Sequence, residues 1–283
     1  MKKFYVILTI LMVLLILMVS FVLNVQWENT SIGVTRYNVK SKELPKAFDG
    51  YKIILLTDLQ GSDFVEQMHN KVSLEVQNAN SGYMIVFVGD LLDGGVAQSD
   101  NVANRLISAL EGFGSFYAVS GNHDLWTDRL DDYIAMWKDK VKFLENKSVE
   151  IERNGEYITM YGISDPYVWN YDEAKNIVNE YRKELYVGDG YNILLFHRAN
   201  MLDEFIDDEF DLVLSGHIHG GQVRLPFIGG LKSPHGDWFP KYDGGVYKNK
   251  NNIFIVSRGL GNAVDVPRVF NRGEIVVITL RSS

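Results

Sequence analysis

The sequence predicts an α/β fold in which two packed mixed β-sheets are flanked by helices and preceded by one N-terminal transmembrane helix. Three observations support this prediction. An apolar stretch opens the chain, strand and helix patterns alternate after it, and strand patterns dominate the later part. A second sheet packed on the first accounts for the excess of strands.

The first element is a nearly unbroken apolar stretch from Phe4 to Val25. As a helix that rises about 1.5 Å per residue, it is long enough to cross a hydrocarbon core of about 30 Å. A cleaved secretory signal is the alternative, but such a signal has a shorter apolar region and an Ala-x-Ala-like cleavage site, which residues 20–27 do not contain. We therefore expect residues 1–26 to be a membrane anchor.

Charged and aromatic residues beside this stretch predict its orientation. Lys2 and Lys3 precede it and Trp27 follows it. The positive-inside bias places the short N-terminus in the cytoplasm and the rest of the chain outside. We expect a single-pass protein of the cell membrane, with residues 27–50 as juxtamembrane connector and first strand and residues 51–283 as one extracytoplasmic domain.

The composition limits which groups can bind a metal and which partners the protein can have. The chain has no cysteine, which excludes disulfides, thiolate nucleophiles and cysteine-ligated zinc, so a bound metal must use His, Asp, Asn or Gln. The net charge is -8, and Lys and Arg are not clustered. Since sequence-independent nucleic-acid binding requires clustered positive charge, we expect no nucleic-acid partner.

Strand and helix patterns alternate after a turn at residues 45–50. The first strands are expected at residues 51–57, 83–88 and 116–119, with helices over 63–79 and 102–110 and a third helix opening at Thr127, which reads as an N-cap. The later strands are expected at 149–153, 157–163, 192–197, 212–214, 253–257 and 274–280. This later part forms the second sheet.

Groups that bind metals follow several of these strands directly. They are Asp58 and Gln60, Asp90, the run Asn122-His123-Asp124, His197, and the pair His217 and His219. Open α/β sheets bind ligands at the carboxyl ends of their strands, so these residues can converge on one rim. His217 and His219 should point to the same side of an extended segment. The order of groups implies a two-metal hydrolase.

Each residue also has a structural interpretation. Asp58 and Asp90 could be helix N-caps, Asn122 and His123 a turn residue and a core histidine, and His197 a buried structural histidine. Their combination favours metal binding. We expect Asp93 to be a turn carboxylate or a group behind the ligands, and His69 and His235 to have surface or structural roles.

These motifs resemble the calcineurin-like metallophosphoesterase family, whose signature is Asp-x-His, Gly-Asp-x-x-Asp, Gly-Asn-His-Asp/Glu, a lone His and Gly-His-x-His. The match runs in family order from about Lys52 to Leu225. The extension from His219 to Pro226, the anchor and the run from Ser257 to Gly261 resemble a membrane-associated bacterial branch that includes UDP-2,3-diacylglucosamine hydrolases.

The resemblance implies two divalent metal ions, and imidazole with carboxylate ligands suits manganese, iron or zinc. One ion would take Asp58, Gln60 and His219, the other Asn122, His197 and His217, with Asp90 as the bridging carboxylate. A metal-bound hydroxide would attack a phosphodiester or pyrophosphate in line, in a small-molecule or lipid substrate such as an envelope precursor. His123 would stabilise the transition state or protonate the leaving oxygen, with Asp124 fixing its tautomer.

Gln60 departs from the family pattern, which has histidine there. An amide binds a divalent metal only through a carbonyl oxygen, which is a weaker ligand than imidazole. Gln60 could coordinate through this oxygen, could leave the position to water, or could weaken the enzyme. The last interpretation leads to an alternative function, a non-catalytic phospholigand-binding or scaffold protein.

Substrate contacts are less defined by the sequence. Arg224, Arg258 and Arg268 are candidates for binding phosphate. Two aromatic-rich loops, residues 165–171 and 233–240, could wall the cleft beside the metals or cover the edge of the core.

Overall fold

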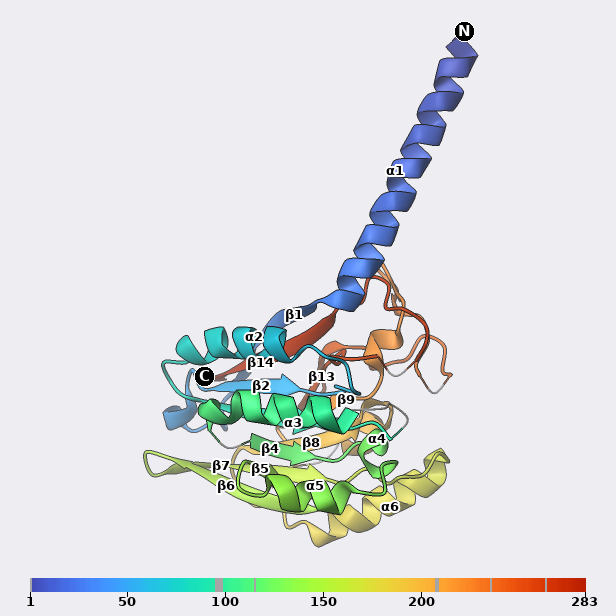
Figure 1. Ribbon diagram of the computed structural model, residues 1–283. Coiled ribbons are helices and arrows are strands. Elements are labelled where there is room, and N and C mark those ends of the chain that lie inside the picture. The colour runs from blue at the N-terminus through green and yellow to red at the C-terminus, as the bar shows by residue number, and fades with distance from the viewer. Residues whose placement is uncertain (1, 95–98, 115, 207–208, 235, 263) are drawn as a thin grey trace.

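The structure is a computed structural model. It describes residues 2–94, 99–114, 116–206, 209–234, 236–262 and 264–283, so His235 lies outside the described residues. Figure 1 shows a layered α/β domain from which one long helix, α1 (Lys2–Thr30), projects.

Helix α1 is long and apolar enough to cross a membrane. Its residues from Lys2 to Leu23 are all exposed, as expected of a segment whose partner is lipid rather than protein. The helix continues past the apolar stretch, and Glu28 in its last turn is buried against the domain. The N-terminal apolar helix predicted from the sequence is therefore present, and its end is packed on the domain.

The first sheet has the strand order β1-β14-β2-β3-β4-β5. These strands are β1 (Ile32–Ser41), β14 (Gly273–Ser282), β2 (Lys52–Leu56), β3 (Tyr83–Val88), β4 (Phe116–Val119) and β5 (Val141–Phe143). Strands β2 to β5 are parallel, and β14 pairs in parallel with β1 along its whole length. The last strand of the chain therefore belongs to the first sheet, and the expectation that the later strands form the second sheet is wrong for β14.

The second sheet has the order β12-β13-β9-β8-β7-β6. Its strands are β12 (Gly245–Lys248), β13 (Ile253–Val256), β9 (Leu212–Gly216), β8 (Asn192–Arg198), β7 (Glu156–Ile163) and β6 (Lys147–Arg153). Apolar residues of both sheets form one core between them, among them Ile53, Val86, Ile193 and Leu214. This is the predicted fold class, with two packed mixed sheets.

Helices cover the outer faces of the two sheets. Helices α2 (Val65–Gln77), α3 (Ser99–Leu110) and α5 (Leu130–Trp137) pack on the first sheet. Helix α6 (Tyr171–Glu184) packs on the second sheet through Ala174 and Val178. The sequence reasoning missed α6, whose apolar residues are sparse in a polar segment, although the side chain of Asn170 caps it by accepting the Glu173 N–H.

Short elements complete the chain. They are the four-residue α4 (Asn122–Leu125), the 3-10 turns η1 (Lys46–Phe48), η2 (Glu111–Phe113), η3 (Ala199–Phe205) and η4 (His219–Gly221), and the hairpin of β10 (Arg224–Leu225) with β11 (Gly229–Gly230). The prediction that Thr127 caps a helix is wrong, because its hydroxyl donates to the Asp124 carbonyl and accepts the Arg129 N–H. Thr127 closes a turn, and α5 begins three residues later.

Candidate metal centre

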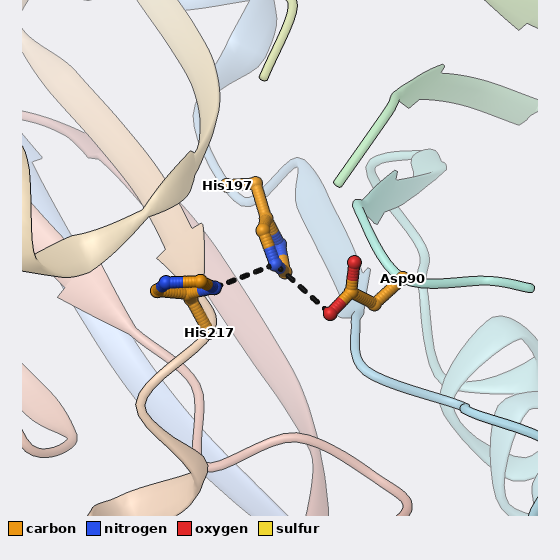
Figure 2. A group of neighbouring side chains, drawn as sticks. All are labelled: Asp90, His197 and His217. Carbon is orange, nitrogen blue, oxygen red and sulfur yellow. Dashed lines mark hydrogen bonds and ion pairs between the residues drawn. The ribbon is translucent and has the colours of Figure 1, made fainter. Parts of the chain in front are cut away.

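Asp90, His197 and His217 form a buried cluster where the two sheets meet (Figure 2). The Nε2 atom of His197 lies 3.2 Å from Asp90 Oδ2 and 3.1 Å from His217 Nδ1. One ligand atom from each of the three residues lies within 4.8 Å of the others. The residues come from the loops after β3 and β9 and from strand β8, so distant parts of the chain converge as predicted.

The backbone of β3 orients His197. Its Nδ1 atom lies 2.8 Å from the carbonyl oxygen of Val88, which fixes the ring and directs Nε2 toward Asp90. Metal-binding histidines are held by the same arrangement, with one nitrogen on a carbonyl or carboxylate and the other on the metal.

Asn122 lies beside this cluster with its amide group buried. Neither its Oδ1 nor its Nδ2 atom has a hydrogen-bond partner among the described residues. The backbone on both sides touches Asp90, since the His123 N–H donates to Asp90 Oδ1 at 2.9 Å and a Cβ at Gly121 would overlap that oxygen. A buried amide without partners costs about 1–3 kcal/mol, and a cation bound to its oxygen would remove part of that cost.

A second group of ligands adjoins the first. His219 Nε2 lies 3.4 Å from Asp58 Oδ1, and both Asp58 oxygens accept the His217 N–H at 3.1 Å. Gln60 Nε2 donates to Asp90 Oδ2 at 3.0 Å, while its Oε1 is buried without a partner among the described residues. Asp90 thus contacts both groups, which we name the His197 set (Asn122, His197 and His217) and the Gln60 set (Asp58, Gln60 and His219).

The loops that carry these residues have unusual backbone conformations. Asp58, Asp90 and His217 have φ values of 54°, 56° and 76°, and Gln60 and His219 are also positive. Such conformations cost about 1–3 kcal/mol each and gather at functional sites. The prediction that His217 and His219 lie on one side of an extended segment is therefore wrong, because β9 ends at Gly216 and the chain turns between the two histidines.

Burial and mutual contact set the charges of the cluster. Burial favours neutral His197, but Asp90 prevails and raises the pKa of His197 to about 10. Burial also opposes ionisation of Asp90, yet His197 and His123 hold the pKa of Asp90 below its ordinary value. Burial raises the pKa of Asp58 to about 6. Without a cation, a proton on His197 neutralises Asp90, so protons and a divalent cation compete for this cluster.

A match to a family model accompanies this geometry. Residues 51–221 match the model described as calcineurin-like phosphoesterase. The chain belongs to the calcineurin-like phosphoesterase family. This confirms the family predicted from the motifs, and the buried cluster with the family's divalent-metal chemistry indicates a metal-dependent phosphoester hydrolase.

Relatives of this phosphoesterase cover most of the chain. The uncharacterized metallophosphoesterase YkuE of Bacillus subtilis is 28% identical over 266 residues, 90% of this chain and 88% of the relative. The uncharacterized metallophosphoesterase Cj0846 of Campylobacter jejuni is 28% identical over 284 residues, 99% of this chain and 72% of the relative. A transmembrane protein with metallophosphoesterase domain from Danio rerio is 25% identical, covering 88% of this chain and 57% of the relative.

His123 of the phosphoesterase faces a different carboxylate from the one expected. Its Nδ1 lies 3.1 Å from Asp93 Oδ1, and, although burial opposes protonation, Asp93 and Asp90 raise the pKa of His123. The Asp124 carboxylate instead accepts the backbone N–H groups of Asp90, Leu92 and Gly121 at 2.7–2.8 Å. The expectation that Asp124 fixes the tautomer of His123 is therefore wrong. Asp124 joins two loops of the site, and Asp93 orients His123.

Two tryptophan side chains lie beside His123. The Trp126 ring lies 4.0 Å from the His123 ring, and the Trp169 ring lies 5.4 Å from Trp126. Trp169 belongs to the aromatic-rich loop 165–171, so this loop borders the site. Trp126 was not singled out from the sequence, although it directly follows α4.

The three arginines considered for phosphate binding are engaged with the protein. Arg224 lies 3.1 Å from Asp243, and Arg258 pairs with Glu274. Arg268 is buried, and its Nη2 lies 3.2 Å from His219 Nδ1. Substrate binding by Arg224 and Arg258 stays a prediction, whereas Arg268 supports a proposed metal ligand.

The end of α1 holds the segment that supports His219. Asn29 pairs through its side chain with both backbone groups of Arg268, at 2.8 and 2.9 Å. Glu28 accepts the Asn271 N–H, and the Asn271 side chain donates to the His219 carbonyl at 2.7 Å. Two chains of contacts therefore run from α1 to His219. They join residues far apart in sequence, so no local pattern predicts them.

Proposed function

We propose that the protein is a membrane-anchored, extracytoplasmic phosphohydrolase with a dinuclear metal centre that acts on a phosphodiester or pyrophosphate of a lipid-linked or envelope precursor. The observation that supports it most is the buried cluster of Asp90, His197 and His217 beside the unpartnered amide of Asn122. Carboxylate, imidazole and amide oxygen form a donor set that suits a divalent metal.

The chain's own residues divide into two ligand sets. We propose that the His197 set holds one ion, the Gln60 set holds the other, and Asp90 bridges them, since its Oδ2 contacts both Gln60 and His197. When bound, two such ions, manganese, iron or zinc, supply a nucleophile at neutral pH and stabilise charge on the attacking and leaving oxygens of a phosphoryl group.

His123 serves as the proton donor or charge-stabilising group. Its ring is partly exposed beside the cluster, and Asp93 holds it in place through the Nδ1 atom. This leaves the Nε2 edge to face a leaving oxygen. Asp124 acts indirectly, because its carboxylate fixes the loops that carry Asp90 and Asn122.

The length and composition of α1 support the membrane anchor. We propose residues 1–26 as the anchor, residues 27–50 as the connector that includes β1, and residues 51–283 as the catalytic domain. Lys2 and Lys3 support an extracytoplasmic catalytic domain. The Danio rerio relative is itself named a transmembrane protein. We also propose that the protein is related to the membrane-associated branch that includes UDP-2,3-diacylglucosamine hydrolases, which is consistent with this placement.

Gln60 favours a second candidate function, a non-catalytic phospholigand-binding or scaffold protein. Its Nε2 donates to Asp90, the carboxylate that both ions would share. If the buried Oε1 of Gln60, which has no partner among the described residues, does not bind the ion, the Gln60 set lacks one ligand and the centre is incomplete.

The test is hydrolysis of bis-p-nitrophenyl phosphate by the full-length protein in phosphatidylcholine nanodiscs with added manganese. We expect turnover that falls at least about 100-fold in Asn122→Ala and His217→Ala. Leu74→Ala, an exposed position on α2, is the matched control and should keep wild-type activity. Background activity that none of these substitutions changes would favour the non-catalytic function.

A further inference from the structure

A mostly apolar pocket lies beside the segment that follows His219. Its volume is about 290 Å³, and its lining comes from three segments: Gly221, Gln222 and Val223; Leu231, Lys232, Ser233, Pro234 and Trp238; and Val264 and Val266. The first segment begins two residues after His219, so the pocket is built onto the chain that carries this proposed metal ligand.

One wall of the pocket is joined to the membrane helix. Two residues after Val266, Arg268 pairs with Asn29, and the Phe270 ring lies 6.1 Å from the Phe21 ring. Phe21 is within the apolar stretch expected to cross the bilayer. Figure 1 shows the orange and red loops of this region gathered at the foot of α1. This wall therefore lies at the level where α1 leaves the bilayer.

Large apolar side chains are exposed on the same loops. They are Phe227, Ile228, Trp238, Phe239, Val266 and Phe270. The Lys232 ammonium lies 5.3 Å from the Trp238 ring. Aromatic and aliphatic side chains next to cations are typical of surfaces that rest in a membrane interface, and such a patch is unfavourable in water. A bilayer that holds α1 would cover it.

We propose that this pocket receives an acyl chain of a lipid phosphoester taken from the bilayer in which α1 is anchored, while the phosphoester group lies at the metal centre beside His219. The inference rests on the proposed phosphohydrolase function and names its substrate class.

The lining favours an acyl chain over a sugar or a base. Val223, Leu231 and Val266 offer no side-chain hydrogen bonds, and the Gln222 Nε2 is already bonded to Asn262 Oδ1 at 2.9 Å, so the polar side-chain groups left in the lining are Gln222 Oε1 and those of Lys232 and Ser233. A polar ligand would lose hydrogen bonds to water and gain few here, whereas each methylene removed from water is stabilising.

Chain-length dependence of hydrolysis tests the proposal. The substrates are alkyl p-nitrophenyl phosphates from methyl to decyl, with full-length protein in phosphatidylcholine nanodiscs. We expect kcat/KM to rise by about threefold per methylene over the first several carbons. Val266→Trp, which fills the pocket, and Val266→Asp, which makes it polar, should flatten this rise, while Leu74→Asp on α2 should keep it. A rise of equal slope in all four proteins would overturn the proposal.

Photolabelling tests the pocket without hydrolysis. Nanodiscs would contain phosphatidylcholine with a diazirine in its acyl chain, and adducts would be mapped by mass spectrometry. We expect adducts on peptides that contain Val223, Leu231 or Val266, reduced in Val266→Trp at an unchanged melting temperature. Adducts confined to α1 would overturn the proposal.

The two experiments separate the inference from the proposed function. Pocket adducts without hydrolysis of any substrate would sink the phosphohydrolase and leave a lipid-chain site. Hydrolysis with neither a chain-length dependence nor pocket adducts would leave the phosphohydrolase and sink the acyl site.

Discussion

The two ligand sets differ in what surrounds them. In the His197 set the two histidines contact each other, and His197 contacts Asp90 and is fixed by a strand carbonyl. In the Gln60 set an amide replaces an imidazole, and the guanidinium of Arg268 lies against His219. Burial, with Arg268 second, lowers the pKa of His219 well below its ordinary value. Although Asp90 contacts both ligand sets, we expect the two proposed sites to differ in their affinity for a cation.

The supports of the two sets differ as well. The His197 set is held from within the domain, by β3 and β8. The Gln60 set is held in part by the last turn of α1, through Asn29 and Arg268. The set with the weaker ligand is thus also the one that contacts α1.

Removing an imidazole from the His197 set should have the largest effect. We expect His197→Ala to lose at least about 100-fold in activity and most of its tightly bound metal, because Asp90 also loses its partner. Metal analysis after dialysis and hydrolysis of bis-p-nitrophenyl phosphate would measure this. His69→Ala, on α2 and outside both sets, is the control. A His197→Ala protein that keeps its metal would contradict the assignment.

Adding one methyl group beside each carboxylate compares the two sets directly. A Cβ at Gly121 would overlap Asp90 Oδ1, and a Cβ at Gly216 would overlap Asp58 Oδ2. We expect each Gly→Ala change to cost about 1–3 kcal/mol through overpacking, with Gly121→Ala losing metal from both sites and Gly216→Ala from one.

Calorimetric titration with manganese and thermal melting would distinguish them. Gly112→Ala is the matched control, because a Cβ there meets no atom within 4 Å. Equal metal loss in Gly121→Ala and Gly216→Ala would argue against a bridging Asp90.

Removing the contact between α1 and Arg268 should weaken metal binding only at the Gln60 set. Asn29→Ala releases the backbone of Arg268, so we expect about tenfold weaker binding of the more weakly held manganese ion and no change for the tighter one. Gln26→Ala, one turn earlier on an exposed face of α1, is the control. A loss shared by both ions would show that Asn29 supports the whole fold rather than His219.

The smallest predicted effect concerns how the buried carboxylate of Glu274, in β14, makes stability depend on pH. Burial opposes ionisation of Glu274, but Arg258 and Thr35 lower its pKa below the ordinary 4.5. A lowered folded-state pKa means that the stabilisation is present above about pH 4.5 and is lost as the pH falls through the folded pKa.

We expect Glu274→Gln to reduce the free energy of unfolding by about 1 kcal/mol at pH 7, because a charged hydrogen bond becomes a neutral one, and by less at pH 4. Denaturant unfolding at both pH values measures this. Glu111→Gln, whose pair with Lys140 is on the surface, should change stability by less than about 0.5 kcal/mol. If the loss of stability in Glu274→Gln were larger at pH 4 than at pH 7, the predicted pH dependence would be wrong.

Sequence reasoning was most successful where a local pattern determines the position of a residue. Asp90 follows β3 and His197 is the last residue but one of β8, and the parallel strands of each sheet bring the two residues to 3.2 Å. The fold class, the apolar helix and the family were predictable for the same reason. The backbone between His217 and His219 was not, because its positive φ values depend on the loops around it.

Contacts between residues far apart in the sequence could not be predicted from local patterns either. Asn29 and Arg268 are separated by 239 residues, and they meet beside the start of the β1–β14 pairing, at Ile32 and Gly273. The carboxylate beside the His123 ring is Asp93, which lies 30 residues earlier, while the adjacent Asp124 turns toward backbone N–H groups. Proximity in sequence favoured the wrong carboxylate.

The most direct measurement is the number of metal ions that the full-length protein retains in nanodiscs after dialysis, compared with Gln60→His. We expect about one tightly held manganese ion in the wild type, a second that dialysis removes, and about two retained ions in Gln60→His, with hydrolysis rising in parallel. Two ions held equally tightly by the wild type, or none by either protein, would contradict it.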